Sequence, residues 1–128
     1  MLKEEIIAHW KRLADEKWLT AESLVKSGRR SDGLFFCHLA IECKLKEIIA
    51  LTNNEEPPRI HNLVVLAETA KLNFDPERRQ ILNEITTFNI AGRYDDYKDK
   101  FYKRATPEYT EKYYNLSKEI LSWLSSVK

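Results

Sequence analysis

The sequence predicts an all-α protein, an up-and-down helical bundle of about five helices. Its apolar residues recur at steps of three and four, and they do not alternate as they do in β-strands. Only three glycines and four prolines interrupt the 128 residues, so few and long elements are expected. Short connections favour antiparallel neighbours. A chain of this length is expected to form a single domain, residues 1–128, with a core of its own.

The first two helices are predicted by their apolar residues. The first has a one-sided stripe and ends near Gly28, because glycine readily takes the left-handed conformation that ends a helix. Ser31 can cap the second, which is apolar nearly all the way round. A helix of this kind must be covered on both sides. It is therefore central in the domain, or it also contacts a partner subunit, and this pattern predicts a homodimer.

Three further helices are expected, and two of them have clear start signals. The turn-forming NNEEPPR segment precedes a short third helix that carries Leu63 and Leu66. Asp75-Pro76-Glu77 and Thr106-Pro107-Glu108 each combine an oxygen cap, a proline and an acid, which is typical of a helix start. The fourth helix is expected to reach Gly92, and the fifth to run through the C-terminal segment.

Composition argues against several classes of protein. A net charge of +1 gives no overall attraction to nucleic acid or to an anionic membrane. No apolar run approaches the roughly 20 residues that cross a bilayer. Cys37 and Cys43 lie too far apart along one predicted helix for a disulfide, and no second pair of ligands suggests a metal site. We expect a cytoplasmic protein without membrane, metal or cofactor.

Two histidines are candidates for chemistry, each with a structural alternative. His38 and Glu42 lie four residues apart and can touch on one face of the second helix. They are a candidate general base with its carboxylate, or a hydrogen-bonded polar spot at a subunit boundary. His61 precedes the third helix, where it can bind free backbone groups at the helix start or serve as a base.

The segment after the fourth helix is the other candidate site. Arg93-Tyr94-Asp95-Asp96-Tyr97, followed by Lys98, reads as a turn that carries ligand-binding or interface residues. All six tyrosines fall between residues 94 and 114, interleaved with lysines. Such a pattern can hold single-stranded nucleic acid, but acidic residues in the same span weaken the positive electrostatic field of the lysines. Tyrosine also packs well between helices, which is the structural alternative.

Several segments together resemble a HEPN domain. They are WKRLADEKWLTAESLVKSGRRSDGLFFCHLAIECKLKEIIAL, then PPRIHNLVVLAE, then FNIAGRYDDY, in that order and at similar spacing. The resemblance spans roughly Trp10 to Tyr97. It implies a five-helix bundle that usually dimerises, found in toxin–antitoxin and defence systems beside a small nucleotidyltransferase. Many such domains are metal-independent RNases, with an arginine followed after four to six residues by a histidine.

This chain matches only half of that RNase signature. Arg93 has the place of the arginine, but Lys98, Asp99 and Lys100 stand where the histidine would fall. The resemblance therefore favours a homodimer that binds a nucleotide, RNA or a partner nucleotidyltransferase through Arg93. One alternative is an RNase with a rearranged site, in which His38 or His61 is the base. The other is a purely structural helical interaction module. Whether the protein is an enzyme stays open.

Overall fold

The computed structural model describes residues 2–93 and 95–127, except for the side chains of residues 92–96. The regular secondary structure of these residues consists of helices, without a strand, which confirms the predicted all-α class. The helices are α1 (Lys3–Lys26), α2 (Arg30–Asn53), α3 (Leu63–Thr69), α4 (Pro76–Arg93), α5 (Asp95–Arg104) and α6 (Pro107–Ser125). Within the described ranges, no helix has the length and apolar character needed to span a membrane.

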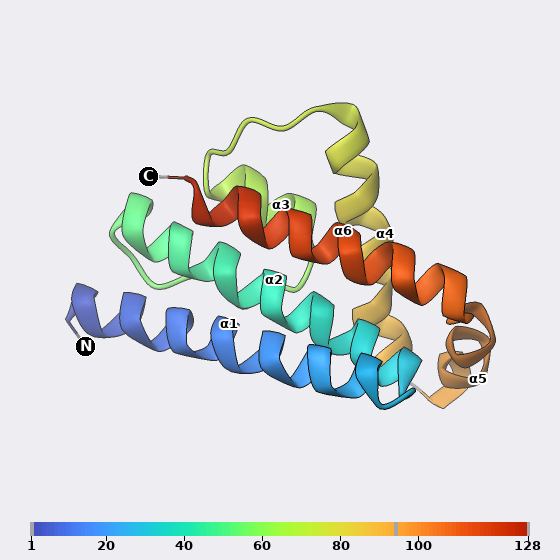
Figure 1. Ribbon diagram of the computed structural model, residues 1–128. Coiled ribbons are helices and arrows are strands. Elements are labelled where there is room, and N and C mark those ends of the chain that lie inside the picture. Colours follow the sequence, from blue (N-terminus) through green and yellow to red (C-terminus); the bar gives the residue numbers. More distant parts are fainter. Residues whose placement is uncertain (1, 94, 128) are drawn as a thin grey trace.

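α1 and α2 form an antiparallel hairpin along one side of the molecule (Figure 1). Gly28 ends α1 with a φ of +83°, as the sequence predicts. The two helices approach closely just beyond this turn, because a Cβ added at Gly33 would lie 2.6 Å from Cγ2 of Val25. Glycine at this position therefore lets the start of α2 lie directly against the end of α1.

The cap predicted at Ser31 is wrong. α2 already begins at Arg30, its N-cap residue is Arg29, and no side chain caps this end by a hydrogen bond. The tight turn explains the earlier start, because the amide of Arg29 binds the carbonyl of Leu24 and the amide of Gly33 binds the carbonyl of Arg29. The first bond closes the end of α1 and the second opens the first turn of α2, so α2 starts without a side-chain cap.

α2 is the central helix of the bundle, in contact with α1, α3, α4 and α6 (Figure 1). Thirteen of its 24 residues are buried, on all sides of the helix. Its apolar surroundings are therefore provided by the same chain. The pattern that predicted a partner subunit from the sequence is explained by this central position, so it carries no separate argument for dimerisation.

Side-chain caps start three of the helices, α3, α4 and α6. Asn62 accepts a hydrogen bond from the amide of Val65 at the start of α3, at 3.1 Å. Asp75 and Thr106 accept from the third residues of α4 and α6, at 2.8 and 3.2 Å. Both predicted start signals are confirmed. α4 crosses the α1–α2 pair steeply in the view of Figure 1. α6 packs against α2 and also reaches α1, where its Tyr114 stacks on Trp18.

Residues 95–104 form helix α5, which corrects the prediction of a turn in this segment and of five helices in all. Phe101 is the buried apolar residue of this helix, and its ring stacks on Phe88 of α4 at a centroid distance of 5.2 Å. Most other described side chains of α5 are exposed. An apolar stripe is therefore missing from the sequence, and contacts with α4 stabilise this helix instead.

Candidate functional site

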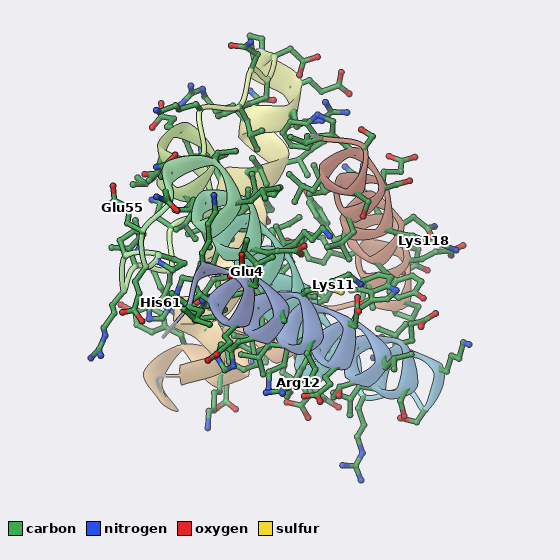
Figure 2. The ribbon with its side chains drawn as sticks, turned by 90° about the vertical axis from the view of Figure 1, so that its left-hand side faces the viewer. Glu4, Lys11, Arg12, Glu55, His61 and Lys118 are labelled. Atoms are coloured by element: carbon green, nitrogen blue, oxygen red, sulfur yellow. The ribbon has the colours of Figure 1, made fainter. Side chains whose placement is uncertain are left out.

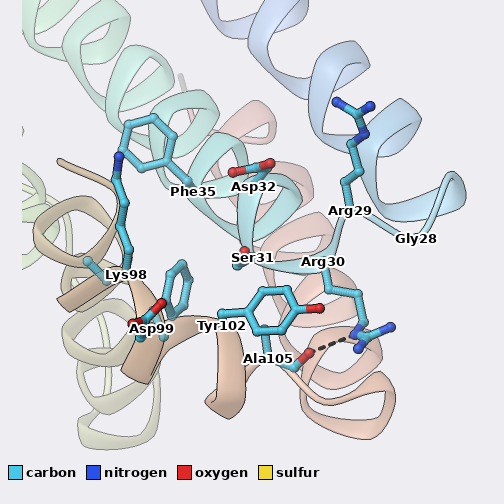
Figure 3. A pocket seen from close by; sticks show the side chains of 12 residues that line it. Gly28, Arg29, Arg30, Ser31, Asp32, Phe35, Lys98, Asp99, Tyr102 and Ala105 are labelled. Atoms are coloured by element: carbon cyan, nitrogen blue, oxygen red, sulfur yellow. Dashed lines mark hydrogen bonds between the residues drawn. The ribbon is translucent and has the colours of Figure 1, made fainter. Parts of the chain in front are cut away.

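A cavity of about 590 Å³ lies between the α1–α2 turn and α5 (Figure 3). Its size is within the range typical of small-molecule sites. The turn and the first residues of α2 form one wall, and α5 with the end of α4 forms the other. It is lined by Gly28, Arg29, Arg30, Ser31, Asp32, Phe35, Ala91, Lys98, Asp99, Phe101, Tyr102 and Ala105.

Three kinds of side chain meet in this cavity. Arg29, Arg30 and Lys98 supply positive charge, and guanidinium groups are well suited to phosphate or carboxylate. Two aromatic rings come from opposite walls: Phe35 of α2 is partly buried and Tyr102 of α5 is 68% exposed. The acids Asp32 and Asp99, which also line the cavity, are acceptors for hydroxyl groups.

Arg30 differs from its neighbour Arg29 in being anchored. Its Nε donates a hydrogen bond to the carbonyl oxygen of Ala105, at 2.7 Å, and its side chain is partly buried (Figure 3). This bond joins the start of α2 to the residue that follows α5, 75 positions later in the chain. Arg29 lines the same cavity but is exposed. The cavity thus combines one fixed guanidinium with one that is free to rotate.

A polar cluster holds the end of α5 against α4. Arg104 lies 3.5 Å from the carboxylate of Glu84 and donates to the hydroxyl of Thr87 at 3.2 Å. The Tyr109 hydroxyl donates to the same carboxylate. Burial raises the pKa of Tyr109 well above its ordinary value, and the hydrogen bond to Glu84 raises it further. This cluster fixes the wall of the cavity that α5 supplies.

The residues predicted around Arg93 are only partly described. Tyr94 and the side chains of Arg93, Asp95 and Asp96 lie outside the described part of the chain, so no role of theirs is tested. The backbone of Arg93 ends α4, two residues after Ala91, which lines the cavity. The end of α4 that carries the predicted arginine is therefore adjacent to this cavity.

The two described members of that segment lie on different sides of α5. Lys98 lines the large cavity. Tyr97, which is exposed, instead lines a second cavity of about 380 Å³ together with Ile90, Lys100 and Arg104. The sequence grouped Tyr97 and Lys98 in one turn. The helix separates them, because successive side chains on a helix point about 100° apart.

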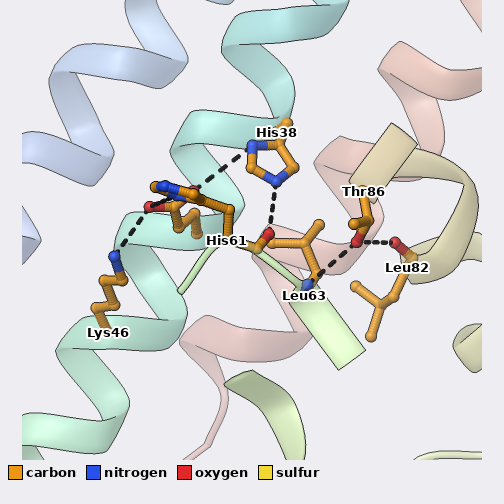
Figure 4. A network of polar contacts seen from close by, with 7 residues as sticks. His38, Lys46, His61, Leu63, Leu82 and Thr86 are labelled. Atoms are coloured by element: carbon orange, nitrogen blue, oxygen red, sulfur yellow. Dashed lines mark hydrogen bonds and ion pairs between the residues drawn. The ribbon is translucent and has the colours of Figure 1, made fainter. Parts of the chain in front are cut away.

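Glu42, His38 and His61 do come together, although away from the large cavity (Figure 4). The carboxylate of Glu42 lies 3.0 and 3.1 Å from Nδ1 of His61 and 2.9 Å from Nζ of Lys46. Nδ1 of His38 is 3.7 Å from the same carboxylate. Lys46 and Glu42 are both buried, and the ammonium also faces the ring of Trp10. The cluster joins α2 to the connection that precedes α3.

The two histidines of this cluster differ in access. His38 is completely buried, and its Nε2 donates to the carbonyl oxygen of His61 at 2.9 Å. The predicted polar spot at a subunit boundary is therefore an interior one within the chain. The His61 side chain is 46% exposed and lies on the same side of the molecule as Glu55 (Figure 2). The predicted binding of backbone groups at the start of α3 falls to Asn62 instead.

Hydrogen bonding fixes the tautomer of His61. A carboxylate only accepts, so Nδ1 carries the hydrogen that binds Glu42. Nε2 is then the basic nitrogen of the neutral ring, on an exposed side chain. A carboxylate that orients an imidazole in this way is a common element of general bases. Among the described residues, no group of three metal-ligating side chains is found.

Sequence reasoning missed most of the large cavity. Arg29, Arg30 and Phe35 are not predicted from the sequence, and Tyr102 is predicted only as one of six clustered tyrosines, because the turn after α1 and helix α5 are far apart in sequence. The paired arginines after Gly28 were the available signal. A turn that exposes two adjacent cations next to a helix start is a place where an anion can bind.

Comparison with protein families gives a match to the HEPN domain over residues 7–127, nearly the whole chain. Comparisons with curated proteins and with solved structures gave no match. The match extends the similarity that the sequence motifs indicate from the first helix through the last.

Proposed function

Because the chain belongs to the HEPN domain family, we propose that it binds the phosphate of a nucleotide or of RNA in the cavity between the α1–α2 turn and α5. The observation that supports this is the composition of the wall. Three cationic side chains and three aromatic rings line one space of about 590 Å³. Phosphate contacts combined with stacking on aromatic rings are the usual basis of binding to unpaired nucleotides.

Arg93 is part of this proposal. It ends α4 beside the cavity, where a guanidinium is well suited to a further phosphate contact. In the proposed complex, the chain acts as a homodimer and as the partner of a nucleotidyltransferase in a toxin–antitoxin or defence system. A neighbouring nucleotidyltransferase gene whose product co-purifies with the chain would support this arrangement. A monomeric mass by light scattering at micromolar concentration would contradict the homodimer.

The test of binding uses a fluorescently labelled single-stranded RNA and its change in anisotropy. Arg29→Gln/Lys98→Gln removes two exposed cations from the cavity wall, and Lys112→Gln/Lys118→Gln removes two exposed cations from α6 as a matched control. We expect saturable binding to the wild type that weakens about tenfold or more in the cavity variant and stays within about twofold in the control. Equal binding by both variants, or no binding by the wild type, would contradict the proposal.

A second candidate function is a metal-independent RNase with a rearranged site. The bond between Glu42 and His61 favours it, because it leaves Nε2 of an exposed imidazole as a base. His38 fits this role poorly, since it is completely buried. The test is RNA cleavage by the purified wild type, His61→Ala and Arg93→Ala. Cleavage that needs both residues would support it, and an inactive wild type would end it.

A purely structural interaction module is the remaining alternative. In that case Arg93 would form a salt bridge with acids of its own segment and would contact no ligand. Arg93→Ala would then lower the thermal stability of the protein without any change in RNA binding. Measuring both properties on the same variant separates this alternative from the phosphate-binding role.

A further inference from the structure

The two adjacent arginines of the large cavity differ in how firmly their side chains are held. Arg30 is held by the bond from its Nε to the carbonyl oxygen of Ala105, at 2.7 Å, whereas Arg29 is exposed. We propose that Arg30 is the phosphate-binding residue of this cavity and that it binds the terminal phosphate of a nucleoside phosphate. The inference rests on the proposed function and assigns the ligand contacts within that site.

Anchoring prepares Arg30 for this role. A guanidinium has five N–H donors, and the bond to Ala105 uses the one on Nε. Both terminal nitrogens then keep donors for a pair of phosphate oxygens. Because the side chain is already held, less conformational entropy is lost when a ligand binds than for a freely rotating arginine. Arg29 is exposed and lacks this preparation, so it is expected to add general positive charge, to which Lys98 also contributes.

The rest of the wall indicates what the phosphate is attached to. Tyr102 offers an exposed ring on which a base can stack, and Phe35 offers a second ring from the opposite wall. Asp32 and Asp99 would repel a bare anion. They can accept hydrogen bonds from ribose hydroxyls, a role that acidic side chains have in nucleotide sites. Cations, rings and acids in one cavity therefore fit a nucleoside phosphate better than inorganic phosphate.

Anchoring also couples the ligand to α5. Arg30 belongs to the first turn of α2, and Ala105 directly follows α5, which carries Tyr102, Lys98 and Asp99. A lysine at position 30 keeps the charge but has no Nε–H group in the place that binds Ala105. Arg30→Lys should therefore lose both the paired terminal nitrogens of the guanidinium and the hydrogen bond to Ala105. Arg29→Lys should lose only the paired nitrogens of an exposed side chain.

The experiment is calorimetric titration with AMP and with adenosine, for the wild type, Arg30→Lys and Arg29→Lys. We expect the wild type to bind AMP at least about tenfold more tightly than adenosine, as charge-assisted hydrogen bonds to phosphate allow. In Arg30→Lys this preference should fall to about twofold or less, and in Arg29→Lys it should persist. Circular dichroism melting curves check that both variants fold.

Two RNA oligonucleotides of one sequence, with a 5′-phosphate or a 5′-hydroxyl, distinguish a free nucleotide from an RNA end. A preference for the phosphorylated RNA that depends on Arg30, without binding of AMP, identifies the RNA end as the source of the phosphate. Tyr102→Leu changes only an exposed side chain and should weaken AMP and adenosine alike.

Three results would overturn the inference. If the wild type binds these ligands without any preference for a terminal phosphate, the role of Arg30 is wrong, and the proposed function stands only as binding to the internal phosphates of RNA. The role of Arg30 is also wrong if Arg29→Lys loses the preference as fully as Arg30→Lys. If the wild type binds neither AMP, adenosine nor either RNA, the proposed function itself fails, and the inference with it.

Discussion

Nδ1 of His61 lies 3.0 and 3.1 Å from the two carboxylate oxygens of Glu42, so that a residue of the α2–α3 connection binds the middle of the central helix. The same carboxylate binds Lys46, whose ammonium is buried. One buried acid therefore holds a loop and neutralises a buried base.

Glu42→Gln should lower the free energy of unfolding by about 3–5 kcal/mol, because the change leaves the buried Lys46 ammonium without its carboxylate. Urea denaturation measures the difference. Asp15→Asn is the matched control, since it breaks a pair with Lys11 in which both side chains are exposed, and it should cost less than about 0.5 kcal/mol. Equal effects of the two substitutions would show that burial of the pair is unimportant.

Gly33→Ala should destabilise the α1–α2 hairpin. The added Cβ would lie 2.6 Å from Cγ2 of Val25, a β-branched side chain with little freedom to move. Overpacking of this kind costs about 1–3 kcal/mol, which exceeds the roughly 1 kcal/mol gained when alanine replaces glycine in a helix. The control is the same substitution in a Val25→Ala background, where thermal denaturation should show a much smaller cost. An unchanged cost would point to another cause.

High pH should weaken the fold through Tyr109. Burial and the bond to Glu84 raise the pKa of this tyrosine in the folded protein. The unfolded chain therefore releases the proton first, and the free energy of unfolding falls as the pH rises above about 10. Tyr109→Phe should make this decline shallower and should cost about 1–2 kcal/mol at neutral pH. Urea denaturation between about pH 8 and pH 11 checks both effects. A decline of unchanged slope would contradict the assignment.

Both cysteines should resist thiol reagents while the protein is folded. Burial raises the pKa of Cys37 to about 12 and that of Cys43 to about 11, where the neighbouring Glu42 raises it further. Since the thiolate is the reactive form, labelling near pH 8 should follow unfolding. Absorbance with a chromogenic disulfide reagent, with and without denaturant, measures this. Fast modification of either cysteine in the native protein would contradict the buried positions.

Local capping chemistry made much of the fold predictable. The starts of α4 and α6 follow from Asp75-Pro76 and Thr106-Pro107, where the caps form as expected. α5 was missed because Phe101 is its buried apolar residue, so its sequence has no apolar stripe. When packing on another helix stabilises a short helix, the sequence of the short helix contains little that predicts it.

The candidate site was less predictable than the fold. The sequence predicts that His38 and Glu42 can touch but treats His61 separately, whereas the structure joins both histidines to the carboxylate of Glu42. The cavity depends on Arg30 and Ala105, which are 75 residues apart. No local pattern indicates that contact, because it arises from the way α5 packs at the end of α4.

The most direct test of phosphate binding in the large cavity is the map of backbone amide chemical shifts on titration of the protein with AMP. We expect the shifts that change most to belong to residues that line the cavity, above all Arg30, Ser31, Phe35, Lys98 and Tyr102. Changes confined to other parts of the chain, such as the surroundings of His61, would contradict the account. A spectrum that neither millimolar AMP nor the 5′-phosphorylated RNA changes would also contradict it.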